Sequence, residues 1–478
     1  MALMFINGES VGAKSGQSYE VKNPATGEVV DTAPKGGAED VQTAVAAAEA
    51  AFPGWRDTAP EARGRLLFKG AELVRQRIDE LAVLETKEQG KPVAEAKREI
   101  EHFLHGLEFY AGLASKIRGA YVPLPDGKMY GMVVKQPIGV CAGIVPWNFP
   151  ITLMGTKVGP ALAAGNTMIV KPASTTPLTA IRIIELLNQA GLPKGVLNIV
   201  TGPGGVVGEE LLRNPRIRRV AFTGETGTGK HVAEVAGREM KRLTLELGGS
   251  DPMIVADDAD LDRAVTGASV GRYYNCGQAC LAIKRLYLFE KVYDEFVEKL
   301  VGKVQRLKVG NGLNADTRVG PLHTAAQREE IEAQVADAVK RGGKVLAGGK
   351  RPEGAEFAKG FFYLPTLLAD VPDDARIVQE ESFGPALPVF KVKDLEEAVT
   401  RANKSIFGLG SSIWTRDLTK ARWAAERLEA GNVWINSLHI GFDEMPFGGV
   451  KYSGIGREHG PEALEYYLEP KGVVVATG

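Results

Sequence analysis

Cysteine is scarce in this sequence, with three cysteines in 478 residues. So few thiols cannot form a disulfide framework for a chain of this length, and we expect a reducing compartment, the cytoplasm. Long hydrophobic runs are missing too, because glycine, proline or a charged residue interrupts each apolar stretch well short of a membrane span. Residues 1–8 have no basic segment followed by an apolar run, so we also predict that no signal peptide is present.

The sequence also has no large net charge. Its 58 lysines and arginines almost balance 59 aspartates and glutamates, for a formal net charge of −1. We therefore expect neither nucleic acid nor an anionic membrane as a partner. The length allows two or three domains with large cores.

Short apolar segments alternate with helical patterns from Gly139 onward. This alternation predicts a parallel, doubly wound α/β sheet with a ligand site at the carboxyl ends of its strands. The alternation restarts after Gly248, so we expect two α/β lobes with a cleft between them. Residues 37–111 predict a layer of helices. The expected strands of the first lobe are residues 140–145, 167–171, 196–201, 218–223 and 243–247.

Residues 119–139 have a different pattern, with two extended arms around the turn Pro125-Asp126-Gly127. Such a hairpin is either an ordinary surface feature or an element through which copies of the chain assemble.

The stretch 275–280 contains a candidate nucleophile, Cys280. Gly277 and Ala279 keep side-chain bulk away from the sulfur, so a substrate could approach it. Cys276 and Cys280 have no Cys/His pair at ligand spacing after them, and we predict no metal site. Taken alone, both thiols are as readily explained as small buried side chains.

Two glycine-rich turns each follow a strand and open a helix. Gly224 to Lys230 nearly matches a nucleoside-triphosphate loop, but His231 stands where a serine or threonine should hold magnesium. Gly202 to Gly208 resembles a dinucleotide fingerprint with one extra residue, and either turn could equally be a simple tight turn.

Two polar side chains stand at the ends of strands in the first lobe. Glu246 lies between two leucines, where burial would raise its pKa toward the range of a general base. A structural ion pair is the alternative. Asn148 lies between prolines in Pro146-Trp147-Asn148-Phe149-Pro150, and such a rigid amide could hold an oxyanion or simply satisfy its own loop.

These stretches together resemble the aldehyde dehydrogenase superfamily over nearly the whole chain. The motifs occur in the family's order: 146–150, Lys171-Pro172-Ala173-Ser174, Phe222-Thr223-Gly224, 245–249, 277–280, Glu381-Ser382-Phe383-Gly384-Pro385 and 446–451. The resemblance implies NAD(P)-dependent oxidation of an aldehyde to an acid.

The resemblance also implies the catalytic roles. Cys280 would attack the aldehyde to give a thiohemiacetal, with the oxyanion held by the Asn148 amide and the Cys280 N–H. After hydride leaves, Glu246 would activate water to hydrolyse the thioester, and Lys157 would relay its proton.

For the cofactor, the resemblance places Lys171 at the adenosine ribose and Glu381 and Phe383 at the nicotinamide ribose. Ser174 stands where NAD-preferring relatives often have a glutamate that repels a 2′-phosphate, so we predict NADP, alongside possible use of NAD. The expected cofactor-binding residues are Pro146, Trp147, Lys171, Ser174, Gly204, Gly208, Phe222, Thr223, Gly224, Gly229, Leu247, Glu381 and Phe383.

The substrate is expected to be a small polar aldehyde, of the lactaldehyde, glyceraldehyde or succinate semialdehyde type. Tyr274 stands where many succinate-semialdehyde relatives have an arginine, which weakens the last of these. By resemblance, the aldehyde would meet Phe149, Leu153, Thr156, Cys276, Ala279 and the loop 437–442, including Phe442.

The resemblance divides the chain into two Rossmann-like lobes and an oligomerisation element, and predicts a homodimer or homotetramer. The cofactor domain would comprise 1–118 and 138–247, the catalytic domain 248–448, and the oligomerisation element 119–137 and 464–478. Two alternatives use the same fold. An acylating enzyme would pass the thioester to coenzyme A or phosphate, and a silent structural or binding protein would have no activity; Glu246, with Cys280 and Asn148, argues against both.

Overall fold

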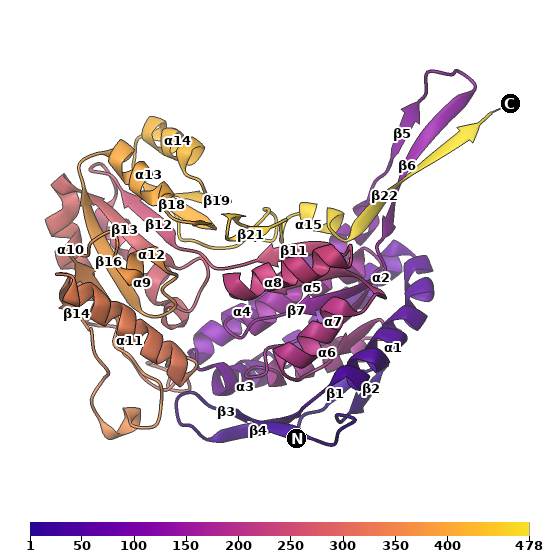
Figure 1. Ribbon diagram of the computed structural model, residues 1–478, viewed down its shortest axis with the longest axis horizontal. Helices are drawn as coiled ribbons and strands as arrows, with labels where there is room; N and C mark the ends of the chain where they lie inside the picture. The colour runs from indigo at the N-terminus through magenta and orange to yellow at the C-terminus, as the bar shows by residue number, and fades with distance from the viewer. Residues whose placement is uncertain (478) are drawn as a thin grey trace.

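The computed structural model describes residues 1–477, which fold around two twisted α/β sheets (Figure 1). The first sheet has eight strands in the order β2-β1-β9-β8-β7-β10-β11-β21, and its five central strands, from β9 to β11, are parallel. Their bounds are β1 Met4–Ile6, β2 Glu9–Val11, β7 Val140–Ile144, β8 Thr167–Lys171, β9 Leu197–Ile199, β10 Ile217–Thr223, β11 Arg242–Glu246 and β21 Gly454–Ile455. The predicted parallel sheet is confirmed, and antiparallel strands at both edges add to it.

Helices cover both faces of this sheet (Figure 1). They are α1 Ala38–Asp57, α2 Pro60–Arg75, α3 Ile78–Gln89, α4 Val93–Leu113, α5 Pro150–Ala163, α6 Leu178–Gln189, α7 Glu209–Arg213 and α8 Thr226–Arg238. A hairpin of β3 Ser18–Lys22 and β4 Val29–Pro34 lies beside them. None of the helices in residues 1–477 combines the length and the apolar composition that crossing a membrane requires.

The second sheet has seven strands in the order β14-β15-β16-β13-β12-β18-β19. The chain crosses into it between Glu246 and Asp251. Its strands are β12 Asp251–Val255, β13 Ile283–Phe289, β14 Lys344–Ala347, β15 Thr366–Ala369, β16 Ala386–Val392, β18 Gly410–Trp414 and β19 Asn432–Ile435. Its helices are α9 Leu261–Tyr273, α10 Glu290–Val304, α11 Ala325–Lys340, α12 Arg376–Gln379, α13 Leu395–Asn403 and α14 Leu418–Arg427. Every residue of β12 and β13 is buried, as expected for strands covered on both faces.

A separate three-stranded sheet projects from the body as an arm (Figure 1). It consists of β5 Ala120–Pro123, β6 Met129–Pro137 and β22 Leu468–Ala476, which follows the short helix α15 Glu462–Glu465. The strand β22 pairs antiparallel with β6 from end to end. The predicted hairpin and its C-terminal partner strand are therefore both present. A last pair, β17 Phe407–Gly408 and β20 Val450–Lys451, lies near the return of the chain to the first sheet.

The chain turns sharply after α9, just before Cys280. Asn275, Cys276 and Gly277 all have left-handed backbones, with φ of 49°, 56° and 72°. At Gly277 a Cβ would lie 2.3 Å from the carbonyl oxygen of Gly384. Only glycine fits this position without strain, because the backbone of another segment occupies the space.

We expect Gly277→Ala to lower the free energy of unfolding by about 2–4 kcal/mol, since the methyl group must displace the Gly384 backbone. Gly302→Ala is the matched control: a Cβ there meets nothing within 4 Å, and alanine favours the helix α10. Thermal denaturation of both variants measures the difference, and equal midpoints would contradict the prediction.

Candidate active site

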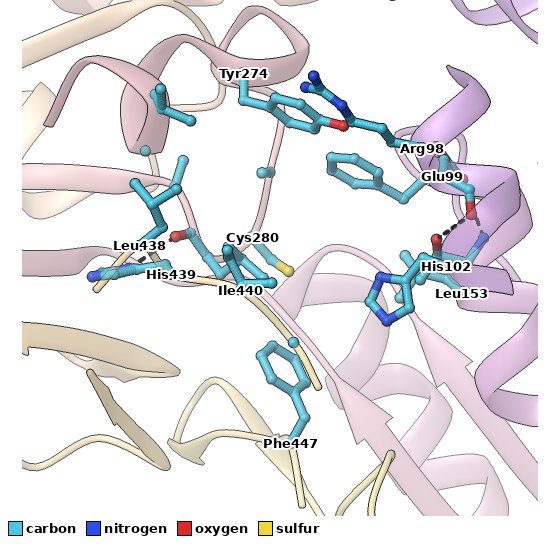
Figure 2. Close-up of a pocket in the computed structure, with 18 of the residues that line it drawn as sticks. Arg98, Glu99, His102, Leu153, Tyr274, Cys280, Leu438, His439, Ile440 and Phe447 are labelled. Carbon is cyan, nitrogen blue, oxygen red and sulfur yellow. Dashed lines mark hydrogen bonds between the residues drawn. The ribbon is translucent and has the colours of Figure 1, made fainter. Parts of the chain in front are cut away.

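A cavity of about 380 Å³ lies where α4, α5 and the segment after α9 meet the loop that follows β19. In Figure 2 the sulfur of Cys280 points into this cavity, between the loop carrying Ile440 and the side chains of His102 and Leu153. Most of the lining is apolar, and the polar side chains in it include Arg98, Glu99, His102, Thr152, Tyr274, His439 and His459.

The turn before Cys280 is held by the side chain of Asn275. Its Oδ1 accepts from Gln89 Nε2 (3.1 Å), and its Nδ2 donates to the Asn148 carbonyl (2.8 Å). Its backbone N–H donates to Glu95 Oε2 (2.8 Å). Gln89, Glu95 and Asn148 belong to the first lobe, so one buried asparagine fixes the nucleophile's turn against the opposite side of the cleft.

Cys280 is half-buried, whereas Cys141 and Cys276 are buried. Burial raises the pKa of the Cys280 thiol, the Lys284 ammonium lowers it, and the carboxylates of Glu381, Glu246 and Asp251 raise it; together they bring this pKa to about 12. The thiol is therefore protonated at neutral pH unless nearby charge changes.

Asn148 lies two residues before the start of α5, in the loop that follows β7. Its side-chain amide donates to the carbonyl of Gln278, two residues before Cys280, at 3.1 Å. Its backbone carbonyl accepts from Lys91 Nζ (2.9 Å) as well as from Asn275. The structure thus brings the predicted oxyanion amide to the nucleophile's segment.

Glu246 ends β11 and is 3% exposed. Among residues 1–477, no hydrogen-bond donor reaches either of its carboxylate oxygens. Burial, and next the charge of Glu458, raises the pKa of Glu246 well above its usual value, against the opposing charges of Lys157 and Arg457. A buried carboxylate without a partner is costly, and this one acts electrostatically on Cys280.

Lys157 is fully buried and pairs with Glu458 rather than with Glu246. Its Nζ donates to Glu458 Oε1 and to Thr223 Oγ1, both at 2.8 Å. The positive charge of Lys157 nevertheless lowers the pKa of Glu246, as expected of a cation close to this carboxylate.

The predicted cofactor residues gather at the carboxyl ends of the first sheet's strands and at the facing loop from the second lobe. The Trp147 ring, beside Pro146, stacks on His323 (4.6 Å between centroids) and meets the edge of Phe383 (5.6 Å). Lys171 ends β8, and burial lowers its pKa to about 8. Ser174 Oγ donates to the Gly202 carbonyl (2.8 Å).

The glycines of this region have different environments. At Gly204 and Gly208 a Cβ would meet nothing within 4 Å, but only Gly204 is exposed, whereas Gly208 is buried. At Gly229 a Cβ would lie 2.3 Å from Leu247, and at Gly224 it would lie 2.6 Å from the Phe222 ring. These last two glycines allow close packing.

The predicted substrate residues divide into two groups. Phe149, Leu153 and Ala279 line the cavity. Three others are not in its lining: Thr156 donates to Glu458 Oε2 (2.7 Å), Cys276 lies in the core of the second lobe, and Phe442 is 49% exposed.

The basic side chains at the end of the glycine-rich turn 224–230 have a structural role that does not involve a nucleoside triphosphate. Lys230 Nζ lies 4.1 Å from the centroid of the Tyr452 ring, and His231 pairs with Glu209 (2.8 Å). Both side chains have protein partners.

Two groups at the site were not predicted from the sequence. Lys284 is a fully buried cation four residues after Cys280, and it stands beside Arg285 in a strand that is apolar from Leu286 to Phe289 apart from the Tyr287 hydroxyl; two charges in such a strand are the signal that could have revealed it. His102 and His459 surround Asp443 in the cavity wall, with ligand atoms within 4.8 Å of one another. This set could hold a metal, but Asp443 already accepts hydrogen bonds from His459 Nδ1 (2.8 Å) and His105 Nδ1 (2.7 Å).

Comparison with known proteins identifies the chain's relatives. Residues 11–473 match the aldehyde dehydrogenase family. The chain is 46% identical to a glutarate-semialdehyde dehydrogenase of Pseudomonas putida over 469 residues, covering 98% of this chain and 96% of the relative. It is 43% identical to the NADP(+) succinate-semialdehyde dehydrogenase of Escherichia coli over 466 residues, with the same coverage. A crystal structure of Staphylococcus aureus betaine aldehyde dehydrogenase in complex with NAD+ is 37% identical, with a TM-score of 0.97 over 100% of this chain and 95% of the other.

Proposed function

The chain belongs to the aldehyde dehydrogenase family, and on that premise we propose that it oxidises a small aldehyde to a carboxylic acid through a covalent adduct on Cys280, with Glu246 as the base that releases the product. The observation that carries the proposal is the buried carboxylate of Glu246, which no hydrogen-bond donor among residues 1–477 reaches. A buried carboxylate without a partner lowers stability, and a catalytic role would explain its presence.

The different roles of Cys280 and Glu246 follow from the chemistry of a thiol and a carboxylate. The sulfur adds to the carbonyl carbon as the thiol gives up its proton to solvent, and the resulting tetrahedral oxyanion can expel hydride to a hydride acceptor and leave a thioester. The Asn148 amide and the Cys280 N–H hold the oxyanion. Glu246 then takes a proton from water, which attacks the thioester. Because this carboxylate is in place, hydrolysis is favoured over transfer of the acyl group to coenzyme A.

The donor set fits a nicotinamide dinucleotide, whose role when bound is to accept the hydride. The exposed backbone at Gly204 can approach a pyrophosphate, and Lys171 offers a cation near the adenosine end. Glu381 Oε1 is taken by Lys284 and the Gly249 N–H, and among residues 1–477 no donor reaches Oε2, which can therefore accept from a ribose hydroxyl.

The relatives' names and the side chains that line the cavity both indicate the kind of substrate. Two of the three relatives named above are semialdehyde dehydrogenases, and Arg98, His102 and His459 stand in an otherwise mainly apolar cavity wall. We therefore favour a short aldehyde with a polar far end. Rates with succinate and glutarate semialdehyde, lactaldehyde, glyceraldehyde and phenylacetaldehyde, each with NADP and NAD, test this; oxidation of none of them would overturn the proposed function.

Glu246→Gln is expected to preserve a first burst of reduced cofactor while slowing steady-state turnover about 10²–10⁴-fold, because hydrolysis of the thioester has lost its base. The pKa of Glu246 is raised, so the wild-type steady-state rate rises as pH increases through that pKa and the carboxylate becomes able to accept a proton. The variant loses this rise.

Stopped-flow and steady-state kinetics from pH 5.5 to 9.5 measure both effects. Cys280→Ala is the control, since it should lose the burst as well as turnover. Unimpaired steady-state turnover in Glu246→Gln would remove the carboxylate from the mechanism.

Ser174→Glu is expected to lower kcat/KM for NADP at least about tenfold and to change NAD use far less, because a carboxylate repels a 2′-phosphate and accepts from a ribose diol. Ser115→Glu, at an exposed position in the turn that follows α4, is the matched control. Kinetics with both cofactors at matched concentrations measure the ratio, and wild-type use of NAD alone would refute the NADP proposal.

We further propose that the arm of β5, β6 and β22 joins copies of the chain into a dimer or tetramer. Val474 is 63% exposed on this arm, as is Tyr121 at 68%. Val474→Asp should shift the molar mass toward that of a single 51.2 kDa chain, while Val474→Thr, of similar shape, should shift it less. Light scattering after size exclusion measures this, and a wild-type mass of one chain would contradict the proposal.

A further inference from the structure

We propose that Lys284 is a positioning residue of this active site: its ammonium ties Glu381 to the backbone of Cys280 and places a positive charge beside the thiol. The proposal rests on the proposed function of Cys280 as nucleophile. It concerns a residue that the catalytic roles above do not use.

The contacts of Lys284 connect two parts of the site that are far apart in sequence. Its Nζ donates to the Cys280 carbonyl at 2.7 Å and to Glu381 Oε1 at 2.9 Å. The Lys284 side chain is fully buried, whereas that of Glu381 is 20% exposed. A buried ammonium is costly unless it is paired, so these two acceptors fix its position.

Glu381 is also held by the segment that follows Glu246. Its Oε1 also accepts from the Gly249 N–H at 3.0 Å. At Gly248 a Cβ would come within 2.4 Å of Glu381 Oε2, so the carboxylate packs directly against this backbone. Lys284 therefore connects the segment of Cys280 to Glu381, and Glu381 in turn contacts the backbone that follows Glu246.

The charges that face the Cys280 thiol explain why a cation matters there. The carboxylates of Glu381, Glu246 and Asp251 all disfavour a thiolate, and Lys284 is the cation that opposes them. Removing the Lys284 ammonium leaves the Cys280 sulfur with these anionic groups around it, so the pKa of the thiol rises further. Because the thiolate is the reactive species, the thiol becomes less nucleophilic at a given pH.

Alkylation of Cys280 by iodoacetamide tests the proposal without aldehyde or cofactor. In Lys284→Met the labelling rate at pH 8 should fall at least about fivefold and the rate profile from pH 6.5 to 10 should move to higher pH. Lys284→Arg keeps the charge and should recover much of the rate. Lys340→Met, the same substitution at an exposed position on α11, should match the wild type.

A second variant keeps the test decisive if Lys284→Met folds poorly. Glu381→Gln removes one of the opposing carboxylates and should speed labelling. Peptide mass spectrometry assigns the label to Cys280, and circular dichroism confirms folding. A labelling rate in Lys284→Met within twofold of the wild type, or no acceleration in Glu381→Gln, would overturn the proposal.

The outcome is separate from that of the proposed function. If Lys284→Met labels like the wild type while the wild type oxidises aldehydes, the positioning role fails and the function stands. If the wild type oxidises no aldehyde, the proposed function fails, whatever the labelling rates show.

Discussion

Asn275 is the residue on which the geometry of the site depends. It sits in a left-handed turn at the end of α9, and its backbone and side chain bond to Glu95, Gln89 and Asn148 on the other side of the cleft. The contacts are buried, so each replaces water with a fixed partner. The turn places Cys280 five residues later, and it brings the Asn148 amide to the same segment.

The second constraint is electrostatic. The site contains several carboxylates that are wholly or partly buried, and these carboxylates differ in whether a cation pairs with them. Glu458 is neutralised by Lys157, and Glu381 by Lys284, whereas no donor in the described part of the chain, residues 1–477, reaches either oxygen of Glu246. That difference separates carboxylates that hold the structure from the one that is free to exchange protons, and it is why Glu246 is the base in our account.

The sequence predicted the parts of the fold in which local pattern and burial agree. The strand β7 is a continuous apolar run, and β8 has an apolar centre, Met168 to Val170, because helices cover both faces; such runs are visible without the structure. The strand β18, Gly-Ser-Ser-Ile-Trp, is just as buried, yet its glycine and serines resemble a turn, so it was not predicted.

Site residues that depend on distant partners could not be predicted in the same way. Lys284 resembles a surface charge until Glu381, 97 residues later, is seen to pair with it. Thr156 was expected to meet the substrate, but Glu458, 302 residues away, accepts its hydroxyl. Family motifs supplied the positions of Cys280, Glu246 and Asn148, while the partners of each side chain came only from the three-dimensional arrangement.

The central claim is that the acyl group of the substrate is carried on one sulfur. The most direct test is to mix the protein carrying Glu246→Gln with aldehyde and cofactor, quench with acid within one turnover, and digest for mass spectrometry. The account predicts that the peptide containing Cys280 gains the mass of the acyl group. Reduced cofactor formed without an adduct, or an adduct on another residue, would contradict it.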